Sequence, residues 1–261
     1  MKFWNTLLLC LYSSAVFGEP PREVPIDLLD LFTMNKKIPI VNFYLNDSYP
    51  QTQPKLYSKD LIDSHIEMIT QKRVHYYEET DTWLYQALEK YPIYGKEVGI
   101  IGSAMPWYES IVLAYGGHPT TIEYNKIDTD DDRITILTVD EYNSNPKKFD
   151  VLLSISSIEH DGLGRYGDPI NPNGDLEFMA MAKEKLLKAN GHMILAMPLG
   201  RDCLVWNAHR IYGPLRLPQL LQGWHIVDTF GFSVAGFFRA LGDYGYQPIF
   251  YLAPKNNPPR S

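Results

Sequence analysis

The chain has 261 residues, of which 45% are hydrophobic, and this is enough for one large domain with a substantial core. Its formal net charge is -7 at neutral pH, and no long run of Lys or Arg interrupts the acidic balance. An acidic chain without a basic patch has no general attraction for phosphate backbones, so we expect no nucleic-acid partner.

The first 18 residues have the pattern of a cleavable secretory signal. Lys2 supplies a positive charge, an apolar run follows, and Val16 and Gly18 occupy the third and first places before Glu19. The run is too short and too interrupted for a stable membrane span, which needs roughly 20 apolar residues. A short buried helix or an uncleaved anchor would use the same residues. We expect the secretory pathway, either as a secreted protein or in the lumen of the ER or Golgi.

Two further features agree with that route. Cys10 lies inside the predicted signal, so Cys203 is left alone in the mature chain and no internal disulfide is expected. The triplet Asn46-Asp47-Ser48 has the acceptor pattern for an N-linked sugar. We therefore predict glycosylation at Asn46 in a chain that enters the secretory pathway.

Residues 19–59 are rich in proline and have weak periodicity, which predicts an extended arm with a short helix over 26–32 and a short strand over 40–45. Apolar residues then recur at helical spacing between 57 and 89, so two helices are expected before Pro92. The predicted division is a signal at 1–18, a Pro-rich arm at 19–59, one α/β domain at 60–255 and a loose tail at 256–261.

The stretch from Glu97 to Asn125 predicts a strand, a tight turn at Gly102-Ser103, a helix over about 106–115 and a second strand that ends at Glu123. A unit of this kind opens a nucleotide-binding α/β sheet. The turn lets a ligand approach backbone N–H groups, and an acid that closes the second strand can accept hydrogen bonds from ribose hydroxyls. Glu123 is therefore the predicted ribose-binding residue.

Strands and helices alternate over the rest of the chain, which predicts a mostly parallel sheet covered on both faces. A helix over 176–189 is expected to end at Asn190-Gly191, because this pair is a typical helix stop. A short helix is expected over 215–221. The further predicted strands cover 134–137, 149–154, 192–197, 224–230 and 248–252.

Several of these segments resemble class I S-adenosylmethionine-dependent methyltransferases. Residues 148–154, followed by Ser157-Ile158-Glu159-His160, are similar to the fourth strand and the Glu-His turn of that fold. The string from Ser157 to Pro169, together with Asn173-Gly174-Asp175-Leu176, resembles more narrowly a family of unknown function first described from nematodes, domain of unknown function two-six-eight. The resemblance implies a three-layer, Rossmann-like α/β methyltransferase fold with a mostly parallel seven-stranded sheet.

The same resemblance implies S-adenosylmethionine as the cofactor. The first loop departs from the usual pattern, because Gly102 is followed by Ser103 and the loop has few glycines. Fewer glycines leave less room for the backbone to wrap around the cofactor. The loop also lacks Gly-x-Gly-x-x-Gly, which disfavours a nicotinamide dehydrogenase. The predicted cofactor-binding residues are Gly102, Ser103, Trp107, Glu123, Tyr124, Asp140 and Ser156.

Glu159, His160 and Asp161 are the predicted catalytic residues, because they follow a buried strand at the edge where ligands of open α/β sheets bind. His160 is favoured as the base, since a pKa near 6.5 suits proton removal at neutral pH; alternatively it holds the loop by hydrogen bonds. Glu159 can instead accept backbone N–H bonds or pair with Arg165. Three adjacent residues do not all turn toward one ion, so no metal site is predicted.

Two polar groups are expected to face the acceptor. One is carried by a glycine-rich turn, and the other lies on a later segment expected beside the same mouth, where an arginine could hold a carboxylate or phosphate. Salt bridging to an aspartate is the structural alternative for that arginine. The predicted substrate-binding residues are Arg165, Tyr166, His209, Arg210 and Tyr212.

The favoured function is methyl transfer from S-adenosylmethionine to a hydroxyl of a glycan or a small metabolite. The rival hypothesis is a non-catalytic secreted binding protein that keeps the fold but has lost the cofactor, and the glycine-poor first loop motivates it. A glycosyltransferase is a third possibility, because Asp130-Asp131-Asp132 contains the Asp-x-Asp spacing, but this acidic turn is expected away from the site.

Overall fold

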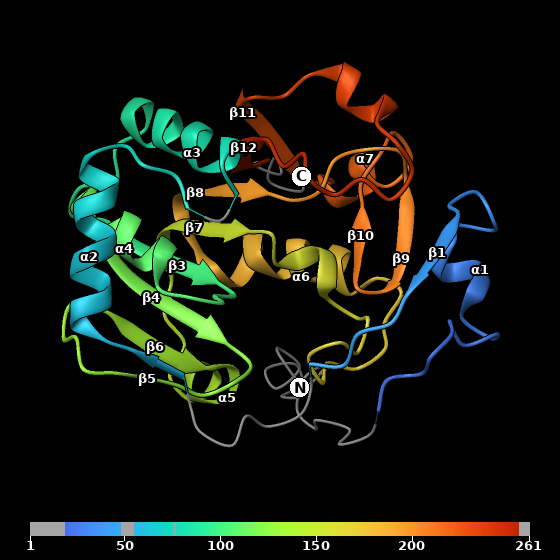
Figure 1. Ribbon diagram of the computed structural model, residues 1–261, viewed down its shortest axis with the longest axis horizontal. Helices are drawn as coiled ribbons and strands as arrows, with labels where there is room; N and C mark the ends of the chain where they lie inside the picture. Colours follow the sequence, from blue (N-terminus) through green and yellow to red (C-terminus); the bar gives the residue numbers. More distant parts are fainter. Residues whose placement is uncertain (1–18, 48–54, 76, 256–261) are drawn as a thin grey trace, which may run out of the picture.

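The computed structural model describes residues 19–47, 55–75 and 77–255 (Figure 1). The predicted signal at 1–18, the predicted tail at 256–261 and Ser48 of the sequon lie outside the described residues. Within the part of the chain that the structure describes, every helix is too short or too polar to cross a membrane.

A seven-stranded sheet runs through the centre of the molecule in the order β11-β12-β8-β7-β3-β4-β6. Its strands are β3 (Glu97–Ile101), β4 (His118–Glu123), β6 (Thr135–Thr138), β7 (Phe149–Ile155), β8 (Leu187–Ala196), β11 (Trp224–Phe230) and β12 (Ile249–Pro254). Only the pairs made by β12 are antiparallel, and the other neighbours run parallel. The predicted Rossmann-like α/β fold is confirmed.

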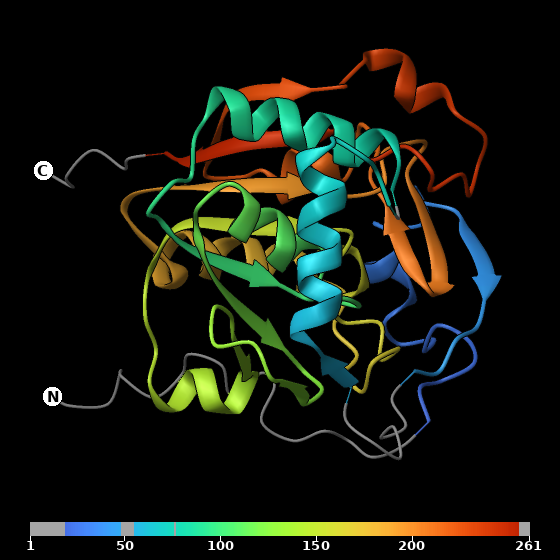
Figure 2. The ribbon, with the colours of Figure 1, turned by 60° about the vertical axis from the view of Figure 1, so that its left-hand side comes forward.

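Helices cover both faces of this sheet (Figures 1 and 2). Side chains alternate along β7, so Leu152 and Leu153 pack on opposite faces of the sheet, each against a different group of helices. Leu153 packs with the first group and Leu152 with the second. The first group is α2 (Lys59–Thr70), α3 (Glu79–Lys90) and α4 (Trp107–Ala114), and the second is α5 (Val139–Ser144), α6 (Gly174–Met181) and α7 (Leu217–Leu220). Ser58 caps α2, and Thr138 with Glu141 forms a capping box on α5.

A smaller sheet joins distant parts of the chain. Strand β1 (Ile40–Phe43) of the predicted arm pairs in parallel with β9 (Cys203–Asn207), which forms a hairpin with β10 (His209–Ile211). The short helix α1 (Leu29–Phe32) fixes the arm further, because the ring of Phe32 packs edge-on against Trp206 at 5.3 Å. Strands β2 (Lys55–Tyr57) and β5 (Ile127–Thr129) form a third, two-stranded sheet. The predicted arm thus contributes two strands, β1 and β2, to the fold.

The predicted helix stop at Asn190-Gly191 is wrong. Helix α6 continues as a π-helical segment, η2 (Ala182–Leu186), and β8 already begins at Leu187. Phe149 pairs with Leu187 whereas Val151 pairs with His192, so β8 contains extra residues opposite β7 and bulges there. Gly191 is accommodated in this bulge, where a Cβ would crowd the backbone oxygen of Phe149. The remaining short helical segments are η1 (Ile158–His160) and η3 (Val234–Phe238).

Candidate functional site

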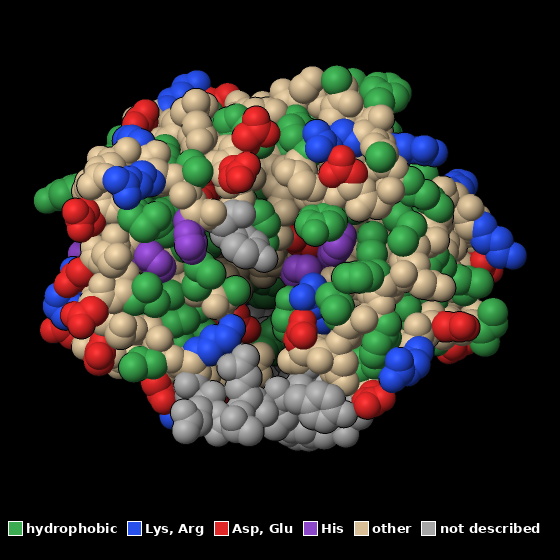
Figure 3. Space-filling view, in the orientation of Figure 1, with side chains coloured by type: hydrophobic (Ala, Val, Ile, Leu, Met, Phe, Trp, Pro, Cys, Tyr) green, Lys and Arg blue, Asp and Glu red, His purple; other side chains and the backbone are tan. Residues whose placement is uncertain are grey.

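A cavity of about 1390 Å³ opens at the carboxyl ends of β3, β4 and β7. The strand order reverses between β3 and β7, and open α/β sheets bind their ligands at such a reversal. Figure 3 shows the mouth as a hollow near the middle of the face, with histidine side chains on both sides. The volume exceeds the roughly 300–1,000 Å³ of a typical ligand pocket, so there is room for two ligands.

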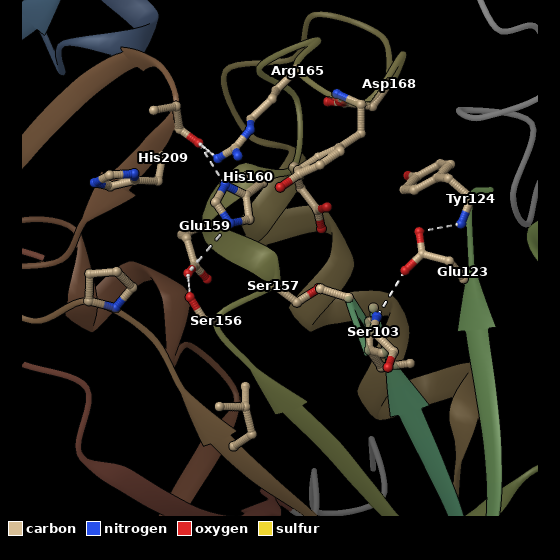
Figure 4. A pocket seen from close by; sticks show the side chains of 18 of the residues that line it. Ser103, Glu123, Tyr124, Ser156, Ser157, Glu159, His160, Arg165, Asp168 and His209 are labelled. Atoms are coloured by element: carbon tan, nitrogen blue, oxygen red, sulfur yellow. Dashed lines mark hydrogen bonds and ion pairs between the residues drawn. The ribbon is translucent and has the colours of Figure 1, made fainter. Parts of the chain in front are cut away.

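The turn after β3 and the end of β4 meet at the carboxylate of Glu123 (Figure 4). The backbone N–H of Ser103 donates to Oε2 at 2.9 Å, and the N–H of Tyr124 donates to Oε1 at 2.8 Å. Burial raises the pKa of Glu123, and the neighbouring backbone N–H groups oppose this shift. Gly102 has a φ of 70°, and a Cβ there would overlap the side-chain oxygen of Ser157. The turn is therefore restricted to glycine.

A buried network supports this turn from below. The hydroxyl of Tyr57 donates to the carbonyl of Ser103 at 2.9 Å, and that of Thr121 donates to Glu109 at 2.6 Å. Burial raises the pKa of Glu109 to about 7. Trp107 also lines the cavity, and its indole N–H donates to Asp81 at 3.0 Å.

The Glu-His turn after β7 lies across the cavity from Glu123 (Figure 4). Ser156 has a φ of 50°, which turns the chain sharply, and its hydroxyl donates to Glu159 Oε1 at 2.6 Å. His160 Nδ1 lies 2.6 Å from the carbonyl oxygen of Ala208 and carries the proton, because a carbonyl only accepts. His160 Nε2 is therefore the free acceptor, 3.8 Å from Glu159 Oε1.

The pKa values of this pair are displaced in opposite directions. Burial raises the pKa of Glu159 to about 7. Burial, with a contribution from the charge of Arg165, lowers the pKa of His160 to about 3. Near neutral pH the imidazole is uncharged, so the two side chains do not form an ion pair. His160 is a hydrogen-bond acceptor there and a weaker base than its sequence position predicts.

The third predicted catalytic residue, Asp161, also lines the cavity, and burial raises its pKa well above the usual value. The loop that follows is held by Asp168, whose carboxylate accepts from the N–H groups of Gly162 at 2.7 Å and Gly164 at 3.1 Å. Both glycines have positive φ, and a Cβ at Gly162 would overlap the carbonyl of Asn171. This loop is a rigid part of the wall.

Three of the predicted substrate-binding residues line the cavity, namely Arg165, Tyr166 and His209. Arg165 Nε donates to Asp47 Oδ2 at 2.7 Å, which ties the loop to the arm. The ring of Tyr166 packs edge-on against His160 at 5.5 Å. Among the described residues, His209 Nε2 has no hydrogen-bond partner, and burial lowers the pKa of His209 to about 4.

The other two predicted substrate-binding residues point away from the cavity. The guanidinium of Arg210 is buried and donates to the backbone carbonyls of Asp161 at 2.6 Å and Asn171 at 3.3 Å. The hydroxyl of Tyr212 is buried and donates to Asp175 at 2.9 Å. Arg210 thus holds the Glu-His loop to β10, and Tyr212, which directly follows β10, is bonded to α6 through Asp175.

Most of the predicted cofactor-binding residues are brought together. Gly102, Ser103, Trp107, Glu123, Tyr124 and Ser156 all line the cavity. Asp140 does not, because it is an exposed residue of the first turn of α5, while its neighbour Val139 faces the cavity. Asn46 is half-buried next to the Arg165 partner Asp47, and its glycosylation stays a prediction.

Sequence reasoning missed one wall of the cavity. Val41 and Phe43 reach it from β1, Val205 reaches it from β9, and Tyr244 and Gln247 reach it from the loop before β12. These residues form no local motif, because pairing between distant strands creates the wall.

Comparison with curated proteins gives no match. Three solved structures with similar folds follow. Burkholderia thailandensis 1,6-didemethyltoxoflavin-N1-methyltransferase with S-adenosylhomocysteine is 13% identical (TM-score 0.47; 80% of this chain, 93% of that chain). A Lactobacillus delbrueckii subsp. bulgaricus ribosomal protein L11 methylase is 13% identical, with a TM-score of 0.39, and the match covers 68% of this chain and 80% of that chain. The glycopeptide N-methyltransferase MtfA is 12% identical, with a TM-score of 0.45, and the match covers 67% of this chain and 89% of that chain.

A family model matches residues 95–236, more than half of the chain, and the protein therefore belongs to the family described as Caenorhabditis protein of unknown function, DUF268.

Proposed function

We propose that the protein binds S-adenosylmethionine across the ends of β3 and β4 and transfers its methyl group to a hydroxyl of a small-molecule acceptor. One observation carries this proposal: the Glu123 carboxylate is held at the cavity, at the end of the second strand of the opening unit, by the turn at Gly102-Ser103.

The residues around Glu123 fit a nucleoside. An ionised carboxylate offers about four acceptor positions, and Ser103 and Tyr124 fill one on each oxygen. Remaining positions can accept from ribose hydroxyls. Apolar side chains nearby suit a flat base, since Ile122 and Tyr142 pack in one cluster and both line the cavity.

When bound, S-adenosylmethionine supplies a methyl group that is already activated by a positively charged sulfur. The protein then has to align the acceptor and receive a proton. His160 Nε2 can accept a hydrogen bond from the acceptor hydroxyl, because the Ala208 carbonyl fixes the proton on Nδ1. The buried carboxyl of Glu159, 3.8 Å away, would stabilise the imidazolium that forms. Glu159 then acts through His160 as a positioning residue.

Calorimetric titration of the mature chain with S-adenosylmethionine and S-adenosylhomocysteine tests the proposal. We expect both to bind, and mass spectrometry of the native protein should detect an adenosyl compound that copurifies. Failure of both compounds to bind folded protein would overturn the proposal and favour a binding protein that has lost the cofactor.

The proposed location is the lumen of the secretory pathway, and the charge and apolar pattern of residues 1–18 supports it. A chain expressed in secreting cells should lose mass on endoglycosidase treatment, and an Asn46→Gln variant should not. An unglycosylated cytosolic protein would contradict this location.

A further inference from the structure

We propose that the acceptor half of the cavity takes an uncharged aromatic alcohol of the phenol type in preference to a glycan. The inference rests on the proposed function, because it names the acceptor class of the same site. It concerns the part of the cavity lined by β1, β9, the loop over 160–168 and the loop before β12.

The first argument is the apolar face of the small sheet. Val41 of β1 pairs with Val205 of β9, and both side chains face the cavity. Their neighbours Ile40 and Leu204 pack on the opposite face, in the cluster around Trp206. Val205 is 5% exposed and packs with Val41 and Ile211, so the alternation backs this wall with apolar side chains and leaves part of that surface open to a ligand.

The second argument is the set of exposed rings on the same wall. Phe43 is 56% exposed and Tyr244 is 58% exposed, and both line the cavity. Exposed apolar rings in a concave site favour binding of a ligand ring, because the contact removes apolar surface of both from water. Tyr244 also packs edge-on against His209 at 5.1 Å, which places its ring beside a second ring of the cavity wall. A flat aromatic ligand matches this wall.

The third argument is that several polar groups on this side already have partners, since Asp168 accepts from the N–H groups of Gly162 and Gly164. Arg165 is already paired with Asp47 and donates to the carbonyl of Ala208, so its charge does not require an anionic ligand. His160 Nε2 is an acceptor without a hydrogen-bond partner within the described chain, because the Ala208 carbonyl holds the proton on Nδ1. A phenol needs only one such acceptor for its single hydroxyl. A sugar would place several hydroxyls against Val41, Phe43 and Val205, which offer none of them a partner.

The test measures binding with 4-methylphenol and methyl β-D-glucopyranoside as probes, by calorimetry, on protein saturated with S-adenosylhomocysteine and on protein without it. We expect 4-methylphenol to bind at least tenfold more tightly than the glucopyranoside. Phe43→Ala should weaken 4-methylphenol binding about tenfold and leave the dissociation constant for S-adenosylhomocysteine unchanged.

The matched control is Phe238→Ala, because Phe238 is 82% exposed and does not line the cavity. This variant should bind both probes as the natural protein does. Tighter binding of the glucopyranoside, or an unchanged affinity of Phe43→Ala for 4-methylphenol, overturns the inference. Absence of S-adenosylhomocysteine binding is a separate result that removes the proposed function, and the probe titration without it still tests the acceptor wall.

Discussion

Replacing Glu123 with glutamine tests the proposed nucleoside site most directly, because it removes the charge of the side chain and keeps its shape. The two backbone donors, Ser103 and Tyr124, each bind one carboxylate oxygen. Glutamine has only one side-chain oxygen, so one of these N–H groups faces an amide nitrogen in the variant. The same change weakens the acceptor positions that would bind ribose.

The expected loss of affinity follows from hydrogen-bond energies. A hydrogen bond to a charged group contributes about 1.5–3 kcal/mol and a neutral one about 0.5–1.5 kcal/mol. Two ribose hydroxyls therefore lose roughly 2–3 kcal/mol together, which is roughly a 30-fold to 150-fold rise in the dissociation constant. The free energy of unfolding should change less, because burial already disfavours the charged form of Glu123 and raises its pKa.

Calorimetric titration with S-adenosylhomocysteine measures this effect, and thermal unfolding checks that the variant is folded. Asp140→Asn is the matched control, since it makes the same acid-to-amide change at an exposed residue outside the cavity. A Glu123→Gln variant that binds within twofold of the natural protein would refute the assignment of Glu123 as the ribose acceptor.

Three further predictions concern stability in denaturant titrations. Gly102→Ala should cost about 1–3 kcal/mol more than Gly95→Ala, because both residues have φ near 70° but only a Cβ at Gly102 meets a neighbour; equal losses would contradict the predicted overlap. Asp175→Asn should cost about 3–5 kcal/mol, since it leaves the buried guanidinium of Arg216 without its carboxylate partner, and a loss below about 1 kcal/mol would contradict this. Burial raises the pKa of Glu159 from 4.5 to about 7, so its contribution to stability falls as pH rises through this window. Glu159→Gln should therefore gain about 3 kcal/mol relative to the natural protein between pH 4.5 and pH 7, and a difference that does not change with pH would show that the carboxyl titrates normally.

Local patterns were sufficient to predict the central sheet and the half of the cavity beside Glu123. The strand, turn and helix that place Gly102, Ser103 and Glu123 are contiguous in the chain, so their positions follow from hydrophobic periodicity and turn chemistry. The Glu-His turn is equally local, because it directly follows a buried strand. The structure places both segments on the same cavity.

Tertiary pairing determined the parts that sequence reasoning missed. Strand β9 was not predicted, because its partner β1 lies about 160 residues earlier and no local pattern links them. Arg210 carries a charge that favours an exposed position, but four backbone carbonyls that accept from it and the buried carboxylate of Asp175 hold it inside. Asn190-Gly191 stops helices in most contexts, whereas here it lies in a bulge created by pairing with β7.

Because β1 pairs with β9, the two walls of the cavity come from distant parts of the sequence and can change independently in evolution. The residues proposed to bind the nucleoside around Glu123 lie mostly on one contiguous stretch of chain, whereas the opposite wall depends on β1 pairing with a much later hairpin. Under the proposed function, substitutions in β1 should alter acceptor selectivity and leave nucleoside affinity unchanged. A chain that lacks residues 1–43 should still bind S-adenosylhomocysteine and should lose its preference among acceptors.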